Sequence, residues 1–410
     1  MKIALLSYSD TGGGAYIAAF RLLHGLIELN TECRMIVKRK YTNSENVELS
    51  INPRFLLTDK FINYISHKIK KLIYNVAHEA INFGIFHTTN EKFLSERLKN
   101  CDIINVHWIG NETVNIGLLS KINKPIVITM HDLWWIDGLF HYPPVDHETA
   151  RIREKWYLRK LNEITLAKKS DFLTAIKPDI ICPSAWLAEQ VKNCNLVPEK
   201  NIHVIHNPFD FSKWRQRRDS KFYENSNSVL KILFISADLN DKRKGVLLLQ
   251  KVLKSFKDKY TGKITISLVG TNSHSLRNQL KTVDGIEINI TEFVEDSSRL
   301  AEIYNEHDLL LHLALIDNLP NTCVEAVSVG LPVCGINLGG ISDITFGGKA
   351  GVLAGSANVQ EIADNIIPTV LLGNSKMKRA RIRKIAIERF SSAAVTKRYQ
   401  KVFTKKINGA

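Results

Sequence analysis

Two carboxylic acids stand eight positions apart in a segment that combines a predicted loop with a predicted helix. Asp317 lies in the loop, and Pro320 can open the helix because its missing N–H would be unpaired there anyway. Glu325 lies inside the helix, more than one turn on, and Gly330 can close it in the left-handed conformation. In such a layout Glu325 can accept hydrogen bonds from ribose hydroxyls, while free amides at the helix start face an anion or sugar oxygens. The segment therefore suits a sugar nucleotide.

A short basic run precedes a second predicted helix over 245–257. The run consists of Lys242, Arg243 and Lys244 and is closed by Gly245. Such a run is ordinarily a solvated turn. A glycine and a helix start directly after it favour phosphate binding of the point-charge kind typical of lysine.

Glycines follow two predicted strands, where open α/β sheets bind their ligands. Gly12, Gly13 and Gly14 lie between a strand over 2–7 and a helix over 13–29. They permit close approach of an anion to the helix start, and they fit a tight structural turn equally well. Gly270 follows a strand over 264–269 and predicts a further phosphate-side or base-side loop.

Two histidines end predicted buried strands in the first half of the chain. His107 and Trp108 follow a strand over 102–106, and His131 follows a strand over 125–130. Asp132 can orient His131 or cap the following turn. Trp134 and Trp108 can stack on sugar rings, although core packing is the better interpretation for at least one tryptophan here.

Together these features resemble the retaining glycosyltransferases of family 4, which have the GT-B fold, and in particular the bacterial polysaccharide-biosynthesis type. Asp317 and Glu325 match the acid–seven residues–Glu motif, with Asp in place of the usual first Glu. Further pieces in matching order extend the resemblance over nearly the whole chain: 12–14, 129–132, 183–187, 206–210 and 240–245. Relatives often have a Cys-rich loop after the tryptophans, whereas this chain has no cysteine there, which leaves the acceptor open.

The resemblance implies roles for individual residues. It implies that His131 contacts the transferred sugar and that Asp317 holds hydroxyls of that sugar. It also implies that Lys244 binds the donor diphosphate and that Glu325 binds the ribose. These four residues, His131, Lys244, Asp317 and Glu325, form the expected catalytic set.

One position departs from the family pattern. Retaining members place an Arg six residues before the Lys, and here that position is Asp238, so either Arg243 or Lys242 would have to replace it. The expected donor-binding set is Gly13, Gly14, Arg243, Lys244, Gly270, Asn318, Leu319, Pro320, Asn321 and Glu325. The expected acceptor-side set is Gly12, His107, Trp108, Asp132 and Trp134. No D-x-D motif stands in a matching context, so we expect no metal and no cofactor.

Alternating strand and helix patterns predict an α/β fold with doubly wound parallel sheets. With the resemblance, they predict GT-B architecture: two Rossmann-like domains facing a cleft. The expected parts are an acceptor-side domain over 1–205, a linker over 206–230, a nucleotide-sugar-binding domain over 231–388 and a C-terminal helix over 389–410. The resemblance implies that this last helix packs back on the first domain.

The composition of the chain limits the kinds of partner that we expect it to bind. The 410 residues have a formal net charge of +15, which fits nucleic acid, an anionic membrane surface or phosphorylated substrates. No helix-turn-helix, RNA-binding or zinc-finger pattern accompanies the charge, so we expect no nucleic-acid partner. The six cysteines include no C-x-x-C pair, which favours reduced core thiols in a cytosolic enzyme.

The apolar and basic segments of the chain bear on contact with a membrane. The first apolar run is too short for a signal peptide, and no uninterrupted apolar run reaches the roughly 20 residues needed to span a bilayer. Residues 61–85 combine an apolar face with basic residues, which fits a membrane-surface helix and an ordinary surface helix equally well. The net charge and the lipid-linked acceptors common in the family favour contact. We therefore expect a cytoplasmic protein, peripheral on the inner face of the plasma membrane.

The resulting hypothesis is a retaining, metal-independent glycosyltransferase. It would move a hexose from a UDP- or GDP-type nucleotide sugar to a surface polysaccharide, a glycan or a lipid-linked oligosaccharide. Two alternatives stay open: a sugar-nucleotide epimerase or phosphorylase of the same fold, and a non-catalytic nucleotide-binding protein. Release of nucleoside diphosphate or of an epimerised nucleotide sugar would distinguish them.

Overall fold

The structure is a computed structural model that describes residues 1–52, 57, 61, 64, 65, 67, 68, 91–111, 113–216, 229–280 and 283–409. It consists of two compact units: unit 1 is Met1–Pro208 with Ser392–Ala410, and unit 2 is Phe209–Ser391. Most of the expected surface helix over 61–85, and residues 217–228 of the expected linker, lie outside the described residues.

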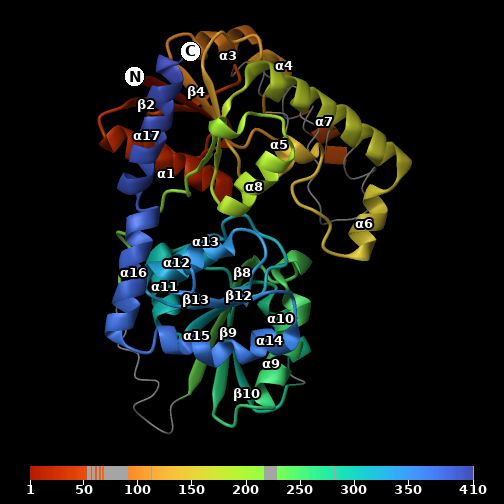
Figure 1. Cartoon of the computed structure of the whole chain (residues 1–410), viewed down its shortest axis with the longest axis vertical. Helices are drawn as coiled ribbons and strands as arrows, with labels where there is room; N and C mark the ends of the chain where they lie inside the picture. The colour runs from red at the N-terminus through yellow and green to blue at the C-terminus, as the bar shows by residue number, and fades with distance from the viewer. Residues whose placement is uncertain are drawn as a thin grey trace. The chain divides into compact units, whose positions relative to one another are not determined.

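Unit 1 carries the labels β2, β4 and α17 in Figure 1. It is built on a parallel sheet with the strand order β3-β2-β1-β4-β5-β6-β7. Its strands are β1 (Lys2–Ser9), β2 (Glu32–Arg39), β3 (Val47–Leu49), β4 (Ile103–Val106), β5 (Ile126–Thr129), β6 (Asp179–Cys182) and β7 (Ile202–Val204). Its helices are α1 (Gly14–Glu28), α3 (Glu91–Leu98), α4 (Ile116–Leu119), α5 (Trp134–Asp137), α6 (His147–Arg153), α7 (Trp156–Ile176), α8 (Ala185–Asn193), the 3-10 turn η2 (Glu199–Asn201) and α17 (Ser392–Asn408). The doubly wound parallel sheet predicted from the sequence is confirmed.

Both faces of this sheet are buried, as the continuous apolar strands require. Ala4 and Leu6 of β1 pack in a core with residues of α3, α4, α7 and α8. Ile3 and Leu5 point to the other face and pack with α1 and α17, where Tyr399 is buried. The final helix of the chain thus belongs to the core of unit 1.

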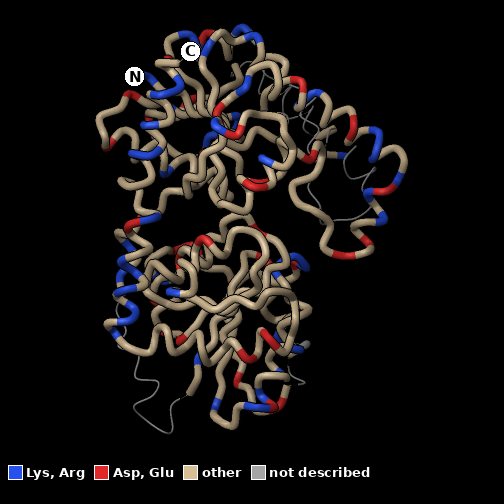
Figure 2. Tube along the Cα trace, in the orientation of Figure 1, with Lys and Arg blue, Asp and Glu red and all other residues tan. Residues whose placement is uncertain are grey.

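Unit 2 repeats the architecture with the strand order β10-β9-β8-β11-β12-β13. Its strands are β8 (Leu230–Asp238), β9 (Ile264–Thr271), β10 (Ile286–Thr291), β11 (Leu309–His312), β12 (Val333–Ile336) and β13 (Gly351–Ala354). Its helices are the 3-10 turn η3 (Lys242–Lys244), α9 (Val246–Lys257), α10 (Ser273–Leu280), α11 (Ser297–Asn305), α12 (Asn321–Ser328), α13 (Ile341–Thr345), α14 (Val359–Asp364), α15 (Ile366–Leu372) and α16 (Lys376–Phe390). Figure 2 shows many Lys and Arg residues along α16, in the stretch whose sequence is strongly basic.

The units divide at Pro208, near the start of the expected linker over 206–230. Phe209 and Trp214 are 2% and 3% exposed and belong to the core of unit 2. The Phe209 amide also donates a hydrogen bond to the Phe390 carbonyl at 2.7 Å. Residues 209–216 of the expected linker are therefore part of unit 2, because burial of two aromatic side chains outweighs the polar composition around them.

Every paired strand in the two described sheets is parallel, so the loops after the strands gather at the carboxyl edge of each sheet. In unit 1 this edge carries the residues after β1, β4 and β5. In unit 2 it carries those after β8, β11 and β12. Among the described residues, no helix is both long and apolar enough to cross a membrane.

Candidate functional site

In unit 2, an ion pair joins the loop after β8 to the loop after β11. The Nζ atom of Lys244 lies 2.7 Å from Oδ2 of Asp317. The Leu315 amide donates to the Arg243 carbonyl at 2.7 Å, which ties the same two loops through their backbones. Burial alone would raise the pKa of Asp317, but the Lys244 ammonium holds it below its usual range. Two residues of the expected catalytic set are therefore brought together in their charged forms.

A third ionisable group, His312, accompanies this pair and was missed by the sequence analysis. His312 ends β11 and is 8% exposed. Burial lowers the pKa of its imidazole to about 4, with Asp317 opposing the shift and Lys244 adding to it. The ring is therefore neutral at pH 7. His312 could have been selected from the sequence because it stands at the carboxyl end of a buried strand, the same feature that singled out His131.

The backbone of Asp317 is fixed by the two glycines that follow β12. Gly339 has a φ of +74°, and a Cβ built there would lie 1.9 Å from the Asp317 carbonyl oxygen. The Gly340 amide donates to that same oxygen at 3.0 Å. Only glycine allows this approach, so the pair positions the carboxylate loop.

Glu325 lies on α12, and a buried tyrosine holds its carboxylate through a hydrogen bond. The hydroxyl of Tyr304, on α11, donates to Oε2 of Glu325 at 2.8 Å. Tyr304 is 0% exposed, and burial, followed by the Glu325 charge, raises its pKa well above the usual value. Tyr304 therefore remains a neutral donor and fixes the carboxylate of a half-buried Glu325.

The position of the missing arginine has a structural role instead. Oδ1 of Asp238 accepts from the Asn240 amide and from the Asn272 side chain, each at 2.8 Å, so it joins the loops after β8 and β9. Arg243 makes a two-pronged contact with Asp241, at 3.1 and 2.8 Å. The nearest arginine in the sequence is thus already engaged with a carboxylate in this structure.

The other expected donor-side residues divide into two groups. Pro320 caps α12 and Asn321 begins it, half-buried, as the sequence predicts. The side chains of Asn318 and Leu319 are 3% and 6% exposed, so only their backbones can face a ligand. Gly270 lies within β9 rather than after it, and a Cβ there would lie 1.9 Å from the Ser236 carbonyl oxygen.

In unit 1, the first loop brings aromatic side chains to the carboxyl edge of the sheet. Gly12 precedes Gly13, which caps α1, and Gly14 begins that helix. Tyr8, Tyr16 and Trp108 form a mutual cluster with ring centroids 5.7 to 6.0 Å apart. The two tyrosines were missed because neither belongs to a recognisable motif. Half-buried aromatic rings of this kind can pack on the apolar face of a sugar.

His107 and His131 form a close pair at the same edge. Nδ1 of His107 lies 3.1 Å from Nε2 of His131, and the rings stack at 24°. Burial lowers the pKa of His131 to about 4 and that of His107 well below its usual value. Both rings are therefore neutral at pH 7, and the N–H of one ring donates a hydrogen bond to the bare nitrogen of the other.

Asp132 joins the loops after β4 and β5. Its Oδ2 lies 2.6 Å from Nδ1 of His141 and accepts from the Trp108 indole at 3.2 Å. Its Oδ1 accepts from the Trp134 amide at 2.9 Å, so Asp132 caps the following turn. Burial would raise the pKa of Asp132, but His141 holds it below its usual range. His141 is a further site residue that the sequence analysis did not select.

Trp134 is not available to a ligand, contrary to the expectation that placed it on the acceptor side. It is 1% exposed and packs in the core. The buried Lys169 ammonium lies 3.5 Å from the centre of its ring and donates to the Trp134 and Gly138 carbonyls. Trp134 therefore supports the loop that carries Asp132.

The described residues also contain no group of three or more His, Cys, Asp or Glu that could hold a metal ion.

Two family profiles match the chain. The one described as Glycosyltransferase Family 4 matches residues 12–213, and the one described as Glycosyl transferases group 1 matches residues 230–370. With this coverage of both units, the chain belongs to glycosyltransferase family 4.

One curated relative and many solved structures resemble the chain, and the solved structures show its fold. N-acetyl-alpha-D-glucosaminyl L-malate synthase from Bacillus anthracis is 24% identical over 243 residues, which are 58% of this chain and 60% of that enzyme. HepE from Anabaena in complex with UDP-glucose has 15% identity and a TM-score of 0.63, covering 99% of this chain and all of that one. Sucrose-phosphate synthase from Thermosynechococcus elongatus has 14% identity and a TM-score of 0.65, with both chains fully covered. The shared fold is GT-B, as predicted from the sequence.

Proposed function

We propose that this protein is a retaining, metal-independent hexosyltransferase that uses a UDP- or GDP-type nucleotide sugar as donor. The observation that carries the proposal is the Lys244–Asp317 ion pair, with Glu325 held on α12, the helix that follows the Asp317 loop. A cation, a sugar-binding carboxylate and a ribose-binding carboxylate are the groups that a nucleotide sugar requires. The complex of the structural neighbour HepE with UDP-glucose supports the same donor class.

In this proposal, binding of the donor breaks the Lys244–Asp317 ion pair, and each of the two groups then contacts the donor instead. The bond between the anomeric carbon and the diphosphate oxygen breaks, and negative charge develops on the leaving diphosphate. The Lys244 ammonium stabilises that charge electrostatically. Asp317, no longer paired with Lys244, then accepts hydrogen bonds from hydroxyls of the transferred hexose.

The acceptor hydroxyl forms the new bond on the same face of the sugar, and its proton passes to the departing phosphate. His131, a neutral ring, would contact the transferred sugar. The Tyr8, Tyr16 and Trp108 cluster would pack on an acceptor sugar. We propose a surface polysaccharide or lipid-linked oligosaccharide as acceptor, and a cytoplasmic location with peripheral attachment to an anionic membrane. The net charge of +15 supports the attachment.

The first test is a thermal-shift screen of UDP, GDP and ADP with their sugars, since a ligand that binds the native state raises the unfolding temperature. The second is donor-dependent release of nucleoside diphosphate in the presence of a chelator. Release that needs added metal would refute metal independence. Conversion of the donor to its epimer without release would instead support an epimerase.

A further inference from the structure

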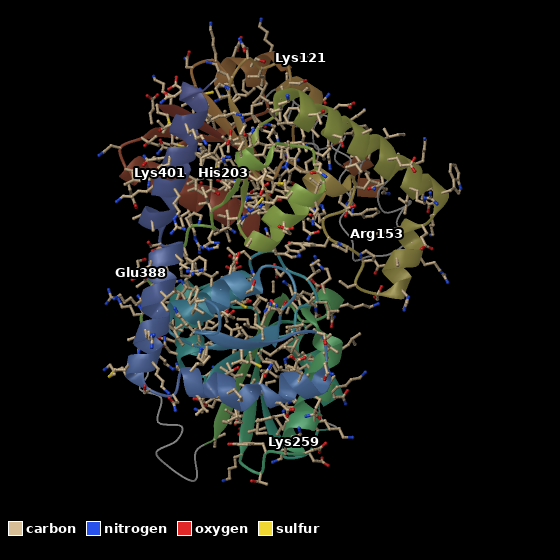
Figure 3. The ribbon with its side chains drawn as sticks, in the orientation of Figure 1. Lys121, Arg153, His203, Lys259, Glu388 and Lys401 are labelled. Atoms are coloured by element: carbon tan, nitrogen blue, oxygen red, sulfur yellow. The ribbon has the colours of Figure 1, made fainter. Side chains whose placement is uncertain are left out.

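Helix α16 carries a large part of the positive charge of this protein. Its 15 residues include seven Lys or Arg and a single acid, Glu388 (labelled in Figure 3), and so contribute +6 to the formal net charge of +15. Figure 2 shows the resulting row of basic residues along α16. Protein surfaces usually intersperse charges of both signs, so this helix departs from an ordinary solvated surface.

The inner face of α16 is fixed in the core of unit 2. Ile382 and Phe390 are buried and pack in the same core as residues of α12. The buried guanidinium of Arg379 donates to the Gly373 carbonyl at 3.0 Å and to the His307 carbonyl at 2.6 Å. These contacts hold the helix rigidly and turn its opposite face outward.

The outer face of α16 combines cations with apolar side chains. Met377, Arg381 and Lys384 are spaced by four and then three residues, which places them in one row along a helix. All three are exposed, and Met377 is 83% exposed. Ile387, three residues after Lys384, is 36% exposed, and Glu388 ends the row.

Most basic residues of α16 have a partner within the protein. Lys378, for example, donates to the Leu371 carbonyl at 2.9 Å. Arg381 and Lys384, in contrast, have no hydrogen bond, ion pair or ring contact with another described residue. Local contacts therefore leave these two cations unexplained. The basic residues that have a partner are Lys376, Lys378, Arg379, Arg383 and Arg389.

The stability of the helix does not explain the charge either. Arg381 and Lys384 are like charges three residues apart, and such neighbours repel each other on a helix surface. The first turn of α16 contains Lys376 and Lys378 and no acid, although the positive end of the helix dipole disfavours cations. An anionic partner along the outer face would relieve both costs.

The exposed apolar side chains indicate which anionic partner fits. A bilayer surface accepts cations at its headgroups and apolar side chains just beneath them. Nucleic acid is bound mainly through cations on its phosphates, which gives Met377 no function. The combination of Met377 with Arg381 and Lys384 therefore favours lipid.

We propose that the outer face of α16 binds an anionic phospholipid surface, with Arg381 and Lys384 at the headgroup phosphates and Met377 and Ile387 in the interface. The proposal names the surface for the peripheral attachment proposed above and rests on that part of the proposed function. None of the residues proposed for donor binding belongs to this face.

Sedimentation of the full chain with vesicles at low salt tests the proposal. The vesicles are phosphatidylcholine with and without phosphatidylglycerol. The charge variant is Arg381→Gln with Lys384→Gln. The matched control is Lys251→Gln with Lys254→Gln, which also neutralises two exposed cations three residues apart, on α9 of the same unit.

The wild-type protein should bind the vesicles that contain phosphatidylglycerol, and the charge variant should bind them about 25-fold more weakly. Each cation near an anionic surface strengthens binding roughly fivefold. Met377→Gln should weaken binding about threefold or more, because apolar surface no longer enters the interface. The binding that remains in this variant should be more sensitive to salt, since salt screens charges only.

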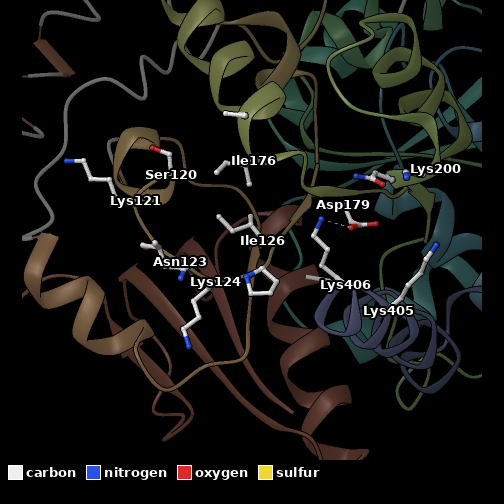
Figure 4. A pocket seen from close by; sticks show the side chains of 15 residues that line it. Ser120, Lys121, Asn123, Lys124, Ile126, Ile176, Asp179, Lys200, Lys405 and Lys406 are labelled. Atoms are coloured by element: carbon white, nitrogen blue, oxygen red, sulfur yellow. Dashed lines mark ion pairs between the residues drawn. The ribbon is translucent and has the colours of Figure 1, made fainter.

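A second control tests whether unit 1 makes the contact instead. Unit 1 has a pocket of about 620 Å³ lined by Lys200 and Lys405, among other residues (Figure 4). Lys200→Gln with Lys405→Gln should stay within about threefold of wild type, as should the α9 control, since remote surface charges are screened. An equal loss in either control and the charge variant would overturn the proposal.

Two further outcomes would also overturn it. One is a wild-type protein that stays in the supernatant with phosphatidylglycerol vesicles. The other is binding of a single-stranded RNA probe that the charge variant loses, without any vesicle binding, which would assign the face to nucleic acid. Unfolding temperatures show whether each variant remains folded.

Nucleotide-sugar binding separates this test from that of the proposed function. In a thermal-shift measurement, the charge variant should respond to UDP- and GDP-sugars as wild type does. Nucleotide-sugar binding without vesicle binding would refute the role of α16 alone. Vesicle binding that depends on α16, in a protein that binds no nucleotide sugar, would refute the proposed donor and leave the role of α16 intact.

Discussion

The ammonium of Lys244 and the carboxylate of Asp317 lie 2.7 Å apart although 73 positions separate them in the chain. The Lys244 ammonium holds the pKa of the Asp317 carboxyl below its usual range, and neither side chain is fully buried, with exposures of 31% and 20%. In the proposed function this pair stands where the diphosphate and the sugar of the donor meet. Binding of the donor must then replace one ion pair by two sets of hydrogen bonds.

Lys244→Ala should lower turnover by about a hundredfold, because a positioned cation matters most when charge develops on the leaving group. Lys242→Ala is the matched control from the same basic run, and it should change turnover by less than about threefold since its exposed side chain faces solvent. Steady-state release of nucleoside diphosphate measures both. Equal, small losses would show that the run is only a solvated turn. A larger loss for Arg243→Ala would show that this arginine replaces the one missing at Asp238.

Glu325→Ala should weaken nucleotide binding by about 1.5–3 kcal/mol, because a charged acceptor for ribose hydroxyls is lost. Tyr304→Phe removes the hydroxyl that anchors Oε2 of Glu325, and we expect a smaller loss of affinity with a destabilisation of about 1 kcal/mol. Calorimetry with UDP or GDP gives the affinities. In the double variant the two effects should not add, since Tyr304 acts through Glu325. A folded Glu325→Ala protein with wild-type affinity would exclude Glu325 as the ribose ligand.

The free energy of unfolding should decrease as the pH falls from about 6.5 to about 4, and buried His312 should contribute to this slope. The unfolded chain binds a proton to this histidine near pH 6.5, whereas the folded protein does so only near pH 4. Protons therefore favour the unfolded state within this window. His312 should lower the free energy of unfolding by at most about 3 kcal/mol across this pH window.

Denaturant titrations of wild type and His312→Asn across this window measure that contribution. The variant should show the shallower pH dependence, while His274→Asn, at an exposed histidine, serves as the control. Parallel curves for His312→Asn and wild type would mean that His312 ionises in the folded protein as it does in the unfolded chain.

Asp132→Asn should destabilise the protein at pH 7 by about 1–3 kcal/mol, because three donors around the carboxylate lose a charged acceptor. The folded pKa of Asp132 is lowered, so its contribution is present above about pH 4, its unfolded value, and is lost as the pH falls through the folded pKa. The difference in the free energy of unfolding between Asp132→Asn and wild type should therefore become smaller at acid pH. Asp171→Asn, on the exposed part of α7, is the control. A constant difference across the titration would contradict this assignment.

The local parts of the site could be predicted from the sequence because each depends on neighbours within a few residues. Pro320, Gly330 and the apolar run after them set the bounds of α12 and β12. Glycines and a basic run marked the loops before α1 and α9. Alternating apolar segments determined two parallel sheets, because only buried strands tolerate such continuous hydrophobic runs.

Only the tertiary structure decided which groups touch. Tyr304, His141 and His312 acquire their roles from partners on other elements, and a residue without a local motif leaves no trace of such a partner in the sequence. The same holds for Trp134, whose burial over Lys169 depends on α7 packing against the loop after β5. Ion pairs, buried pKa shifts and pockets depend on distances through space, and these are set when the sheets assemble and exclude water.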